Sequence, residues 1–400
     1  MEKHAGFNGL EGRIHIALRP DQTVKLHSGR PVLAARVLIG KTPAEALKII
    51  PLLFNVCGTA QSRTALSALH EALASETKPT PEAEYARDLL VRAETAREIL
   101  LRLFRDGPAL LDLPLPAADV FAYLGGLAQG FKSALFGDAP AFSLNALETD
   151  LKPDWIRAQP LIDQLRTFLE QHVFGIPCEA FTSIADTPAL IRWSRAQNTL
   201  AGQIIKRIHD ADWAAQGDAP NACLPLPDLN LQALAARLNA DDAEAFIAAP
   251  DWQGECHETG PLARQWNRPL ITPLRQAFGV GLLTRQAARL LELAALPKRL
   301  TALREREIPL PVRHTHTEPG AGIAGVEAAR GRLHHFIRVD NGKIRQYRIL
   351  APTEWNFHPR GSVARGLSNI HSHTREERTR LAYLVIHAID PCVAYELETG

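Results

Sequence analysis

Two stretches of sequence are the most informative about how this chain folds: LFNVCGTA at residues 53–60 and DPCVAY at residues 390–395. Cys57 stands just before a run of residues with helical spacing, and Cys392 follows an Asp-Pro pair near the other end. A thiol that precedes a helix lies near free backbone N–H groups, which favour the thiolate form that binds metals. A small residue packed into a tight turn is the alternative for each, because free cysteines are often simply buried.

The composition is that of an ordinary globular chain. It has 400 residues, 45 Lys and Arg against 44 Asp and Glu, and 22% charged residues. A formal charge of +1 gives no bulk reason to expect nucleic acid or an anionic membrane as a partner. No apolar run approaches the ~18 residues of a membrane span, and the first residues lack a secretory pattern, so we expect a cytoplasmic protein. The five cysteines are widely spaced without a C-x-x-C, which argues against a disulfide framework.

The residue pattern predicts a mainly α (α+β) protein with small β pieces near both ends. Strands are expected at residues 13–18 and 24–27. A helix is expected to begin after Thr42 as N-cap, with Pro43 next and Glu45 closing a capping box. Residues 81–104 predict an amphipathic, solvent-facing helix, because apolar residues at helical spacing are mixed with Arg and Glu.

Further helices are expected within residues 115–210, broken at 137–140 and 175–177. After a proline-rich connector at 217–228, another is expected at 274–296, with Pro297 interrupting or kinking it. Asn341-Gly342 between two extended runs predicts a β-hairpin of residues 333–339 and 343–349. A last helix is expected at 377–389.

One dinucleotide-binding motif matches by letter only. GAGIAG at residues 320–325 fits G-x-G-x-x-G, but no apolar strand precedes it and no helix opens behind it. We therefore interpret it as a flexible glycine loop that leads to Glu327 and Arg330.

Histidines gather late in the chain, where 8 of 15 lie at residues 314–387. His314 with His316, and His371 with His373, could each offer two imidazoles to a metal. Solvated loop histidines are the commoner outcome of such a composition.

Seven motifs that occur in order along the chain favour a metal-binding interpretation of the two cysteines over simple packing. Together they resemble the large subunit of nickel–iron hydrogenases, with the weakest similarity between residues 105 and 250. The motifs are LEGRIHI at 10–16, GKTPAEA at 40–46, VCG at 56–58, ETGPLAR at 258–264, EAARG at 327–331, PTEWN at 352–356 and DPC at 390–392.

That resemblance implies a metal site, and the chain departs from it where the metals bind. In the family, four cysteines hold a nickel and an iron that carries carbon monoxide and two cyanides. Cys57 and Cys392 match the first member of each cysteine pair, whereas Ala60 and Tyr395 occupy the bridging positions. Two thiolates cannot hold a bimetallic centre, because metal selection depends on the number and type of ligands. We therefore expect no stable nickel site.

The residues around the metals match the family better. Arg330 matches the arginine that points into the site, and Thr353 matches the hydroxyl residue that hydrogen-bonds a cyanide; both are suitable donors to an anionic diatomic ligand. Glu11 matches the glutamate associated with proton movement. The alternatives are that Arg330 pairs with a carboxylate such as Glu327, and that Glu11 is a cap or salt-bridge partner.

The resemblance implies one domain over residues 1–400, with an N-terminal segment 1–75, a helical middle 76–305 and a C-terminal segment 306–400. It is closest to the large-subunit-like assembly proteins of the family, which implies a non-catalytic scaffold or chaperone that transiently holds iron with carbon monoxide and cyanide. Its implied partners are hydrogenase accessory proteins, the large-subunit precursor or the small subunit. The alternatives are an interaction protein without metal and a variant hydrogenase.

Overall fold

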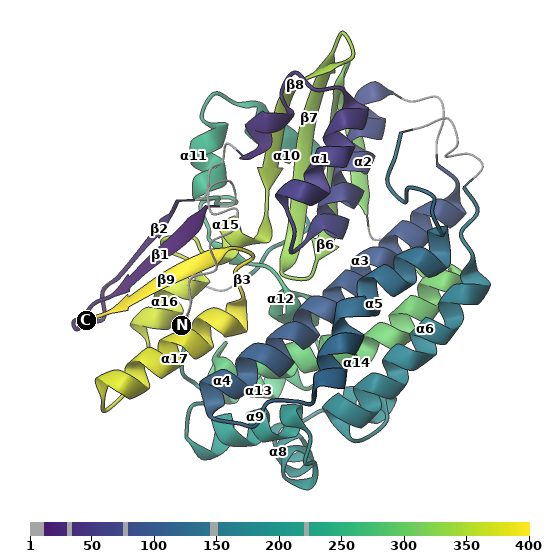
Figure 1. Ribbon diagram of the computed structural model, residues 1–400. Coiled ribbons are helices and arrows are strands. Elements are labelled where there is room, and N and C mark those ends of the chain that lie inside the picture. The colour runs from purple at the N-terminus through teal and green to yellow at the C-terminus, as the bar shows by residue number, and fades with distance from the viewer. Residues whose placement is uncertain (1–11, 30–33, 75–78, 145–150, 220–223, 311) are drawn as a thin grey trace.

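The computed structural model describes residues 12–29, 34–74, 79–144, 151–219, 224–310 and 312–400. In Figure 1, long helices fill the lower right of the molecule and a four-stranded sheet stands above them. The packed apolar faces of the long helices contribute most of the largest cluster of buried side chains. The long helices are α3 (Pro81–Leu101), α5 (Ala118–Phe136), α6 (Trp155–Phe168), α9 (Leu200–Asp210) and α14 (Leu282–Glu305).

Helix α3 lies in the interior, so the prediction of a solvent-facing helix is wrong. It contacts α5, α14 and α2 (Gly58–Leu73), and most of its residues are buried. Several of its charged residues are paired inside the protein. Arg63 Nε lies 2.7 Å from Asp88 Oδ1, Arg63 Nη2 lies 2.7 Å from Glu84 Oε2, and Arg87 Nη1 lies 3.0 Å from Glu84 Oε1. An Arg/Glu pattern that usually marks a solvated face can be buried when opposite charges satisfy one another.

Beyond α3 the helical middle follows the predicted breaks with one correction. Helix α5 ends at Gly137, and the turn after α6 ends at Gly175; both glycines have positive φ, 55° and 67°. The helix expected at 274–296 is divided instead at Gly279 (φ 58°), between α13 (Ile271–Phe278) and α14. Helix α14 then continues through Pro297 to Glu305, so Pro297 does not interrupt it.

The remaining helices are short. Three of the connecting turns are a 3-10 helix η1 (Ala34–Leu38) and the π-helical turns η2 (Arg102–Asp106) and η4 (Leu169–Phe174). Short α-helices are α4 (Gly107–Leu111), α7 (Cys178–Thr182), α8 (Thr187–Ala196), α10 (Leu231–Asn239), α11 (Ala243–Ala248), α12 (Pro261–Gln265), α15 (Pro352–Asn356) and α16 (Ser362–Ser368).

The four-stranded sheet is antiparallel in the order β5-β6-β7-β8. Its strands are β5 (Arg313–Glu318), β6 (Ala321–Ala328), β7 (Gly331–Asp340) and β8 (Lys343–Leu350). The predicted hairpin is confirmed, and Asn341 and Gly342 both have positive φ (49° and 70°), as a tight two-residue turn requires. Helix α2 packs on β5, β6 and β7, while α10 packs on the same strands with a different set of core residues (Figure 1).

From Ala321 on, the expected glycine loop is a buried strand instead, so that prediction is wrong. Gly322 and Gly325 lie in β6, beneath α2 and beside β7. A Cβ at Gly322 would come 2.3 Å from the carbonyl oxygen of Ala68. The glycines therefore serve close packing of helix on sheet rather than flexibility.

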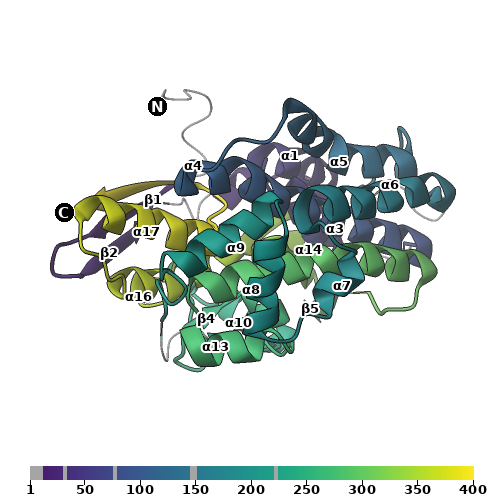
Figure 2. The same cartoon turned by 90° about the horizontal axis from the view of Figure 1, so that it is seen from below.

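A three-stranded sheet joins the two ends of the chain. Strand β1 (Arg13–Leu18) pairs antiparallel with β2 (Val24–Ser28) and parallel with β9 (Ala394–Thr399), and both N-terminal strands were predicted. Figure 2 shows this sheet at one end of the molecule with α16 and α17 (Arg375–Ile389). A third, two-residue pairing joins β3 (Leu224–Pro225) to β4 (His257–Glu258). The predicted last helix is confirmed as α17, and the capping box of α1 (Pro43–Leu53) is formed by Thr42 and Glu45.

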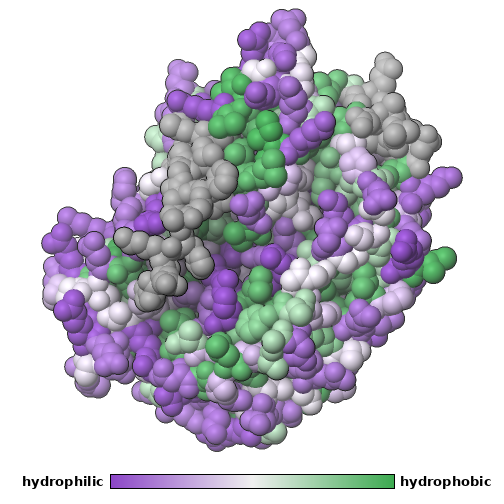
Figure 3. All heavy atoms as spheres, viewed as in Figure 1, coloured by the Kyte–Doolittle hydropathy of each residue, from purple (hydrophilic) through white to green (hydrophobic). Residues whose placement is uncertain are grey.

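The face seen in Figure 3 is largely hydrophilic, with a green area over η1 and α1, where Val37, Ile39 and Leu52 are exposed. Among the residues described, no helix has the length and apolar content to span a bilayer.

Candidate functional site

Cys57 is the N-cap residue of α2, the helix that packs on β5, β6 and β7. Its side chain does not cap the helix. The carboxylate of Glu94 on α3 does so instead, accepting hydrogen bonds from the backbone N–H groups of Thr59 at 2.8 Å and Ala60 at 3.1 Å. The sulfur of Cys57 is thereby left to another partner, the Nε2 of Gln61, which donates to Sγ at 3.6 Å.

Cys392 lies between α17 and β9, just after a backbone turn at Asp390 that has φ 67°. Thr353, in the first turn of α15, contacts it twice. The Thr353 Oγ1 lies 2.9 Å from Cys392 Sγ and accepts from the Cys392 backbone N–H at 3.4 Å. The hydroxyl that the resemblance assigned to ligand binding is therefore next to the second thiol.

Arg330 enters the same site from the tight connection between β6 and β7. Its guanidinium is buried and pairs with Asp390 (Nε to Oδ2, 3.2 Å) and with Glu98 of α3 (Nη2 to Oε2, 3.2 Å). It does not pair with Glu327, the alternative partner considered from the sequence. Glu327 is held by Arg264 and Arg332, which, against the opposing effect of burial, lower its pKa to about 2.

The backbone around Arg330 is clamped by two of the sequence motifs. The Asn356 side chain donates to the Arg330 carbonyl at 3.2 Å and accepts from the Thr259 N–H at 2.8 Å. Gly331 has φ 133°, and a Cβ at Gly260 would come 2.9 Å from the Arg330 carbonyl oxygen. The glycines of ETGPLAR and EAARG are thus needed for close approach, and they fix the direction of the arginine.

The electrostatics show that these groups share one site. Burial raises the pKa of the Cys57 thiol, the negative charge of Cys392 raises it further, and Arg330 lowers it. Although burial opposes it, the carboxylates of Asp390 and Glu98 raise the pKa of Arg330, and the thiolates of both cysteines add to the effect. The helix N-terminus was expected to favour the thiolate of Cys57. In the folded protein burial outweighs that effect, because desolvation penalises the charged form.

The two positions where bridging cysteines were missing are filled by packing and hydrogen bonding. Ala60 is fully buried with Val91 and Val326 around it. The hydroxyl of Tyr395 lies 3.0 Å from His387 Nε2, and burial raises the pKa of this phenol. Neither side chain is arranged as a metal donor.

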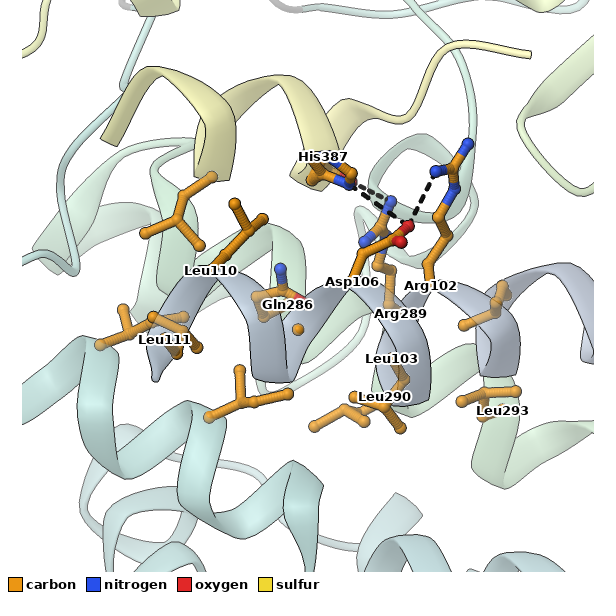
Figure 4. Close-up of a pocket in the computed structure, with 15 residues that line it drawn as sticks. Arg102, Leu103, Asp106, Leu110, Leu111, Gln286, Arg289, Leu290, Leu293 and His387 are labelled. Atoms are coloured by element: carbon orange, nitrogen blue, oxygen red, sulfur yellow. Dashed lines mark hydrogen bonds and ion pairs between the residues drawn. The ribbon is translucent and has the colours of Figure 1, made fainter. Parts of the chain in front are cut away.

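His387 extends this contact to a cluster of charges at the end of α3. Its Nδ1 lies 3.5 Å from Asp106 Oδ2, and Arg102 Nη1 lies 2.8 Å from the same oxygen. Figure 4 shows His387 and Arg102 reaching Asp106 from different elements, with Arg289 beside them. They border a cavity of about 30 Å³, enough for one or two waters. Asp390 links this cluster to the thiol site through Arg102 Nε, 2.7 Å from its Oδ1.

The late histidines contact neighbouring protein groups. His314 Nδ1 contacts the carboxylate of Glu71 and His316 Nδ1 contacts the Glu71 carbonyl, while His371 Nε2 contacts the side chain of Asn369. His373 donates its backbone N–H to Glu377. In the part of the chain that the structure describes, no three His, Cys, Asp or Glu side chains are grouped to hold a metal ion. Glu11 lies outside the described residues.

Sequence reasoning missed several contacts. Cys256 contacts His358, with Sγ 3.3 Å from Nδ1. Asp390 and Glu98, which hold Arg330, were not singled out, although Asp390 stands within the DPC motif. The Gln61 side chain had no motif to mark it.

The fold is that of the nickel-dependent hydrogenase large subunits. A family model described as nickel-dependent hydrogenase matches residues 281–396. The Ni-Fe-Se hydrogenase of Desulfovibrio vulgaris Hildenborough has a TM-score of 0.60 at 17% identity, covering 92% of this chain and 93% of that chain. The enzyme of Desulfomicrobium baculatum gives 0.61 at 15% identity with the same coverage. The predicted fold class is confirmed.

Two longer sequence matches narrow the class. The hydrogenase expression/formation protein HoxV of Cupriavidus necator is 31% identical over 405 residues, covering 97% of this chain and 96% of that protein. HupK of Azotobacter vinelandii, named likewise, is 29% identical over 395 residues, covering 97% and 99%. This chain belongs to the large-subunit-like hydrogenase expression/formation protein family that includes HoxV and HupK.

Proposed function

We propose that this protein is a non-catalytic assembly factor for nickel–iron hydrogenase that holds an iron fragment bearing carbon monoxide and cyanide as cargo. The names of its relatives, hydrogenase expression/formation proteins, support a role in making the enzyme. Partners among hydrogenase accessory proteins or the large-subunit precursor, and a cytoplasmic location, follow from that role.

The observation that carries the proposal is a free donor in the thiol site. Arg330 Nη1 is buried, and within the described residues it has no hydrogen-bond partner. A buried N–H without a partner costs about 1–3 kcal/mol, so a ligand that accepts a hydrogen bond from it would stabilise the site. An anionic diatomic ligand such as cyanide, bound to iron between Cys57 and Cys392, would accept from it. Thr353 Oγ1, beside Cys392 Sγ, is a second donor of suitable chemistry.

The number of thiols supports temporary holding. Cys57 and Cys392 are two soft ligands, and Ala60 and Tyr395, at the bridging positions, offer no third. Fewer ligands bind a metal less tightly, which suits a cargo that must be transferred. A stable nickel site would need the bridging thiolates, so the proposal includes no nickel and no hydrogen turnover.

Infrared spectroscopy of protein purified without air, from cells that express the hydrogenase accessory set, tests the proposal. Metal-bound carbon monoxide and cyanide absorb where protein is nearly silent. We expect bands in the wild type, loss of them in Cys57→Ala and Cys392→Ala, and retention in the control Cys256→Ala, whose thiol faces His358. Bands that persist in both site variants would refute it. A blank spectrum from folded wild type would favour the interaction protein without metal, and hydrogen-dependent dye reduction would favour a variant hydrogenase.

A further inference from the structure

The sulfur of Cys57 stands at one end of a buried line of hydrogen bonds that leaves the thiol site. Gln61 Nε2 donates to Cys57 Sγ at 3.6 Å, Gln61 Oε1 lies 2.8 Å from His335 Nε2, and His335 Nδ1 lies 2.8 Å from Tyr347 Oη. Gln61, His335 and Tyr347 are each at most 1% exposed. Bulk water therefore does not compete for these contacts.

The chemistry of each group fixes the direction of this line. A carboxamide oxygen only accepts, so His335 Nε2 must carry the hydrogen that reaches Gln61. Burial lowers the pKa of His335 to about 3, so the imidazole is neutral and has one N–H. Its Nδ1 must then accept, and the hydroxyl of Tyr347 must donate. With its oxygen taken by His335, Gln61 is left to present an N–H to the sulfur.

The fold supplies the spacing that makes the line possible. Gln61 is on α2, one turn after Cys57, while His335 is on β7 and Tyr347 is on β8. Gly322 of β6 lets α2 approach the sheet, since a Cβ there would strike the helix backbone. Helix and sheet side chains, including Leu66 and Tyr347, form one core cluster. The contact between Gln61 and His335 spans 274 residues of sequence.

We propose that His335 and Tyr347 are positioning residues that hold the Gln61 amide with its N–H toward Cys57, so that the sulfur acts as an acceptor and hence as an iron ligand. This rests on the proposed function. A metal-bound sulfur has no hydrogen and can only accept, so the observed order of donors favours the ligated form. The reversed order would place the Gln61 oxygen against the sulfur, repel a metal-bound thiolate, and require the hydrogen of His335 on Nδ1. Outer partners of this kind orient and tune metal ligands.

The hydrogen on His335 can be measured without iron. In protein labelled with ¹⁵N-histidine, the two ring nitrogens give different shifts, and the signals of His335 are those missing from His335→Asn. We expect the Nε2–H form in the wild type and a mixture in Tyr347→Phe, which lacks the donor that Nδ1 requires. Tyr85→Phe is the matched control, because it removes a tyrosine hydrogen bond of 3.1 Å to the Ile308 carbonyl elsewhere. An Nδ1–H form in the wild type would overturn the inference.

The consequence for the site is read in the infrared spectrum of iron-loaded protein. Tyr347→Phe and Gln61→Leu should shift the carbon monoxide and cyanide bands and lower their intensity several-fold, with Tyr85→Phe unchanged at equal folded yield. Unshifted bands in both variants would overturn the positioning role. If the wild type shows no bands while His335 keeps its hydrogen on Nε2, the iron-fragment proposal fails and the order of the hydrogen bonds stands.

Discussion

Replacing Arg330 with leucine tests how much the buried charges of the thiol site contribute to the stability of the protein. The guanidinium is 4% exposed and lies 3.2 Å from carboxylates of both Asp390 and Glu98. Removing one partner of a buried pair leaves uncompensated charge and costs about 3–5 kcal/mol. Asp390 keeps Arg102 nearby, at 2.7 Å, which places the expected loss at the lower end of that range.

The expected loss converts into a measurable melting shift. With about 2.1 cal/mol/K of unfolding entropy per residue, a 400-residue chain gains roughly 0.8 kcal/mol/K on unfolding. A loss of about 3 kcal/mol then lowers Tm by roughly 4 °C. Differential scanning calorimetry and urea unfolding of the same samples would give Tm and the free energy of unfolding independently.

A matched control separates buried from exposed pairing. Arg345 pairs with Asp340 at 3.3 Å, but both side chains are 60% exposed. Arg345→Leu should cost less than about 1 kcal/mol, because solvent screens exposed pairs. If Arg330→Leu and Arg345→Leu lose the same stability, the argument that the buried pairs hold this site together is wrong.

Three further outcomes are expected. Gly322→Ala should destabilise the protein by about 1–3 kcal/mol or more in urea unfolding, because the added Cβ would overlap α2. The control Gly125→Ala has open space around the added Cβ and should be neutral or stabilising. Equal effects of the two substitutions would count against the helix–sheet contact. Burial lowers the pKa of His334 and His335 to about 3, so below about pH 6.5 the unfolded chain binds more protons than the folded protein. The free energy of unfolding should therefore keep the full contribution of these histidines above that pH and be lower by about 2–3 kcal/mol per histidine at pH 4.5. His334→Gln should halve the slope of the free energy of unfolding against pH in this range. Tyr395→Phe should leave the infrared bands unchanged and cost about 1 kcal/mol from the lost hydroxyl contact; lost bands would instead make Tyr395 a ligand.

Local signals in the sequence predicted local structure well. The Thr42–Glu45 capping box, the Asn341-Gly342 turn and the breaks at Gly137 and Gly175 each depend on the conformational preferences of a few neighbouring residues. Such preferences are largely independent of what the rest of the chain does. The elements that carry these signals were therefore placed correctly.

Tertiary packing overrode the local signal where the predictions failed. The charges of α3 suggested a solvated face, yet Arg63 of α2 and the paired residues of α3 neutralise one another in the interior. The glycines of β6 suggested a loop, yet Gly322 is required because a helix crosses the strand. Neither partner is near in sequence, so no local pattern could have shown it.

The candidate site was predictable in part for the same reason. Motif order identified Cys57, Cys392, Arg330 and Thr353, and the structure brings these four together. The residues that hold them were missed because their contacts are long-range. Glu98 reaches Arg330 across 232 residues, and His335 reaches Gln61 across 274.

The two lost bridging positions favour a purpose-built site over a decayed one. A cysteine replaced by chance in a buried pocket should leave a void or an unpaired polar group at the replaced position, each of which costs stability. Ala60 instead packs fully buried among apolar neighbours, and the Tyr395 hydroxyl has His387 as its partner. Arg330, by contrast, keeps a buried donor unpaired beside the two remaining thiols. The bridging positions are repacked, while a hydrogen-bond donor beside the two thiols has no partner. This combination is expected if the two thiols and the donor together hold a metal that carries an anionic ligand.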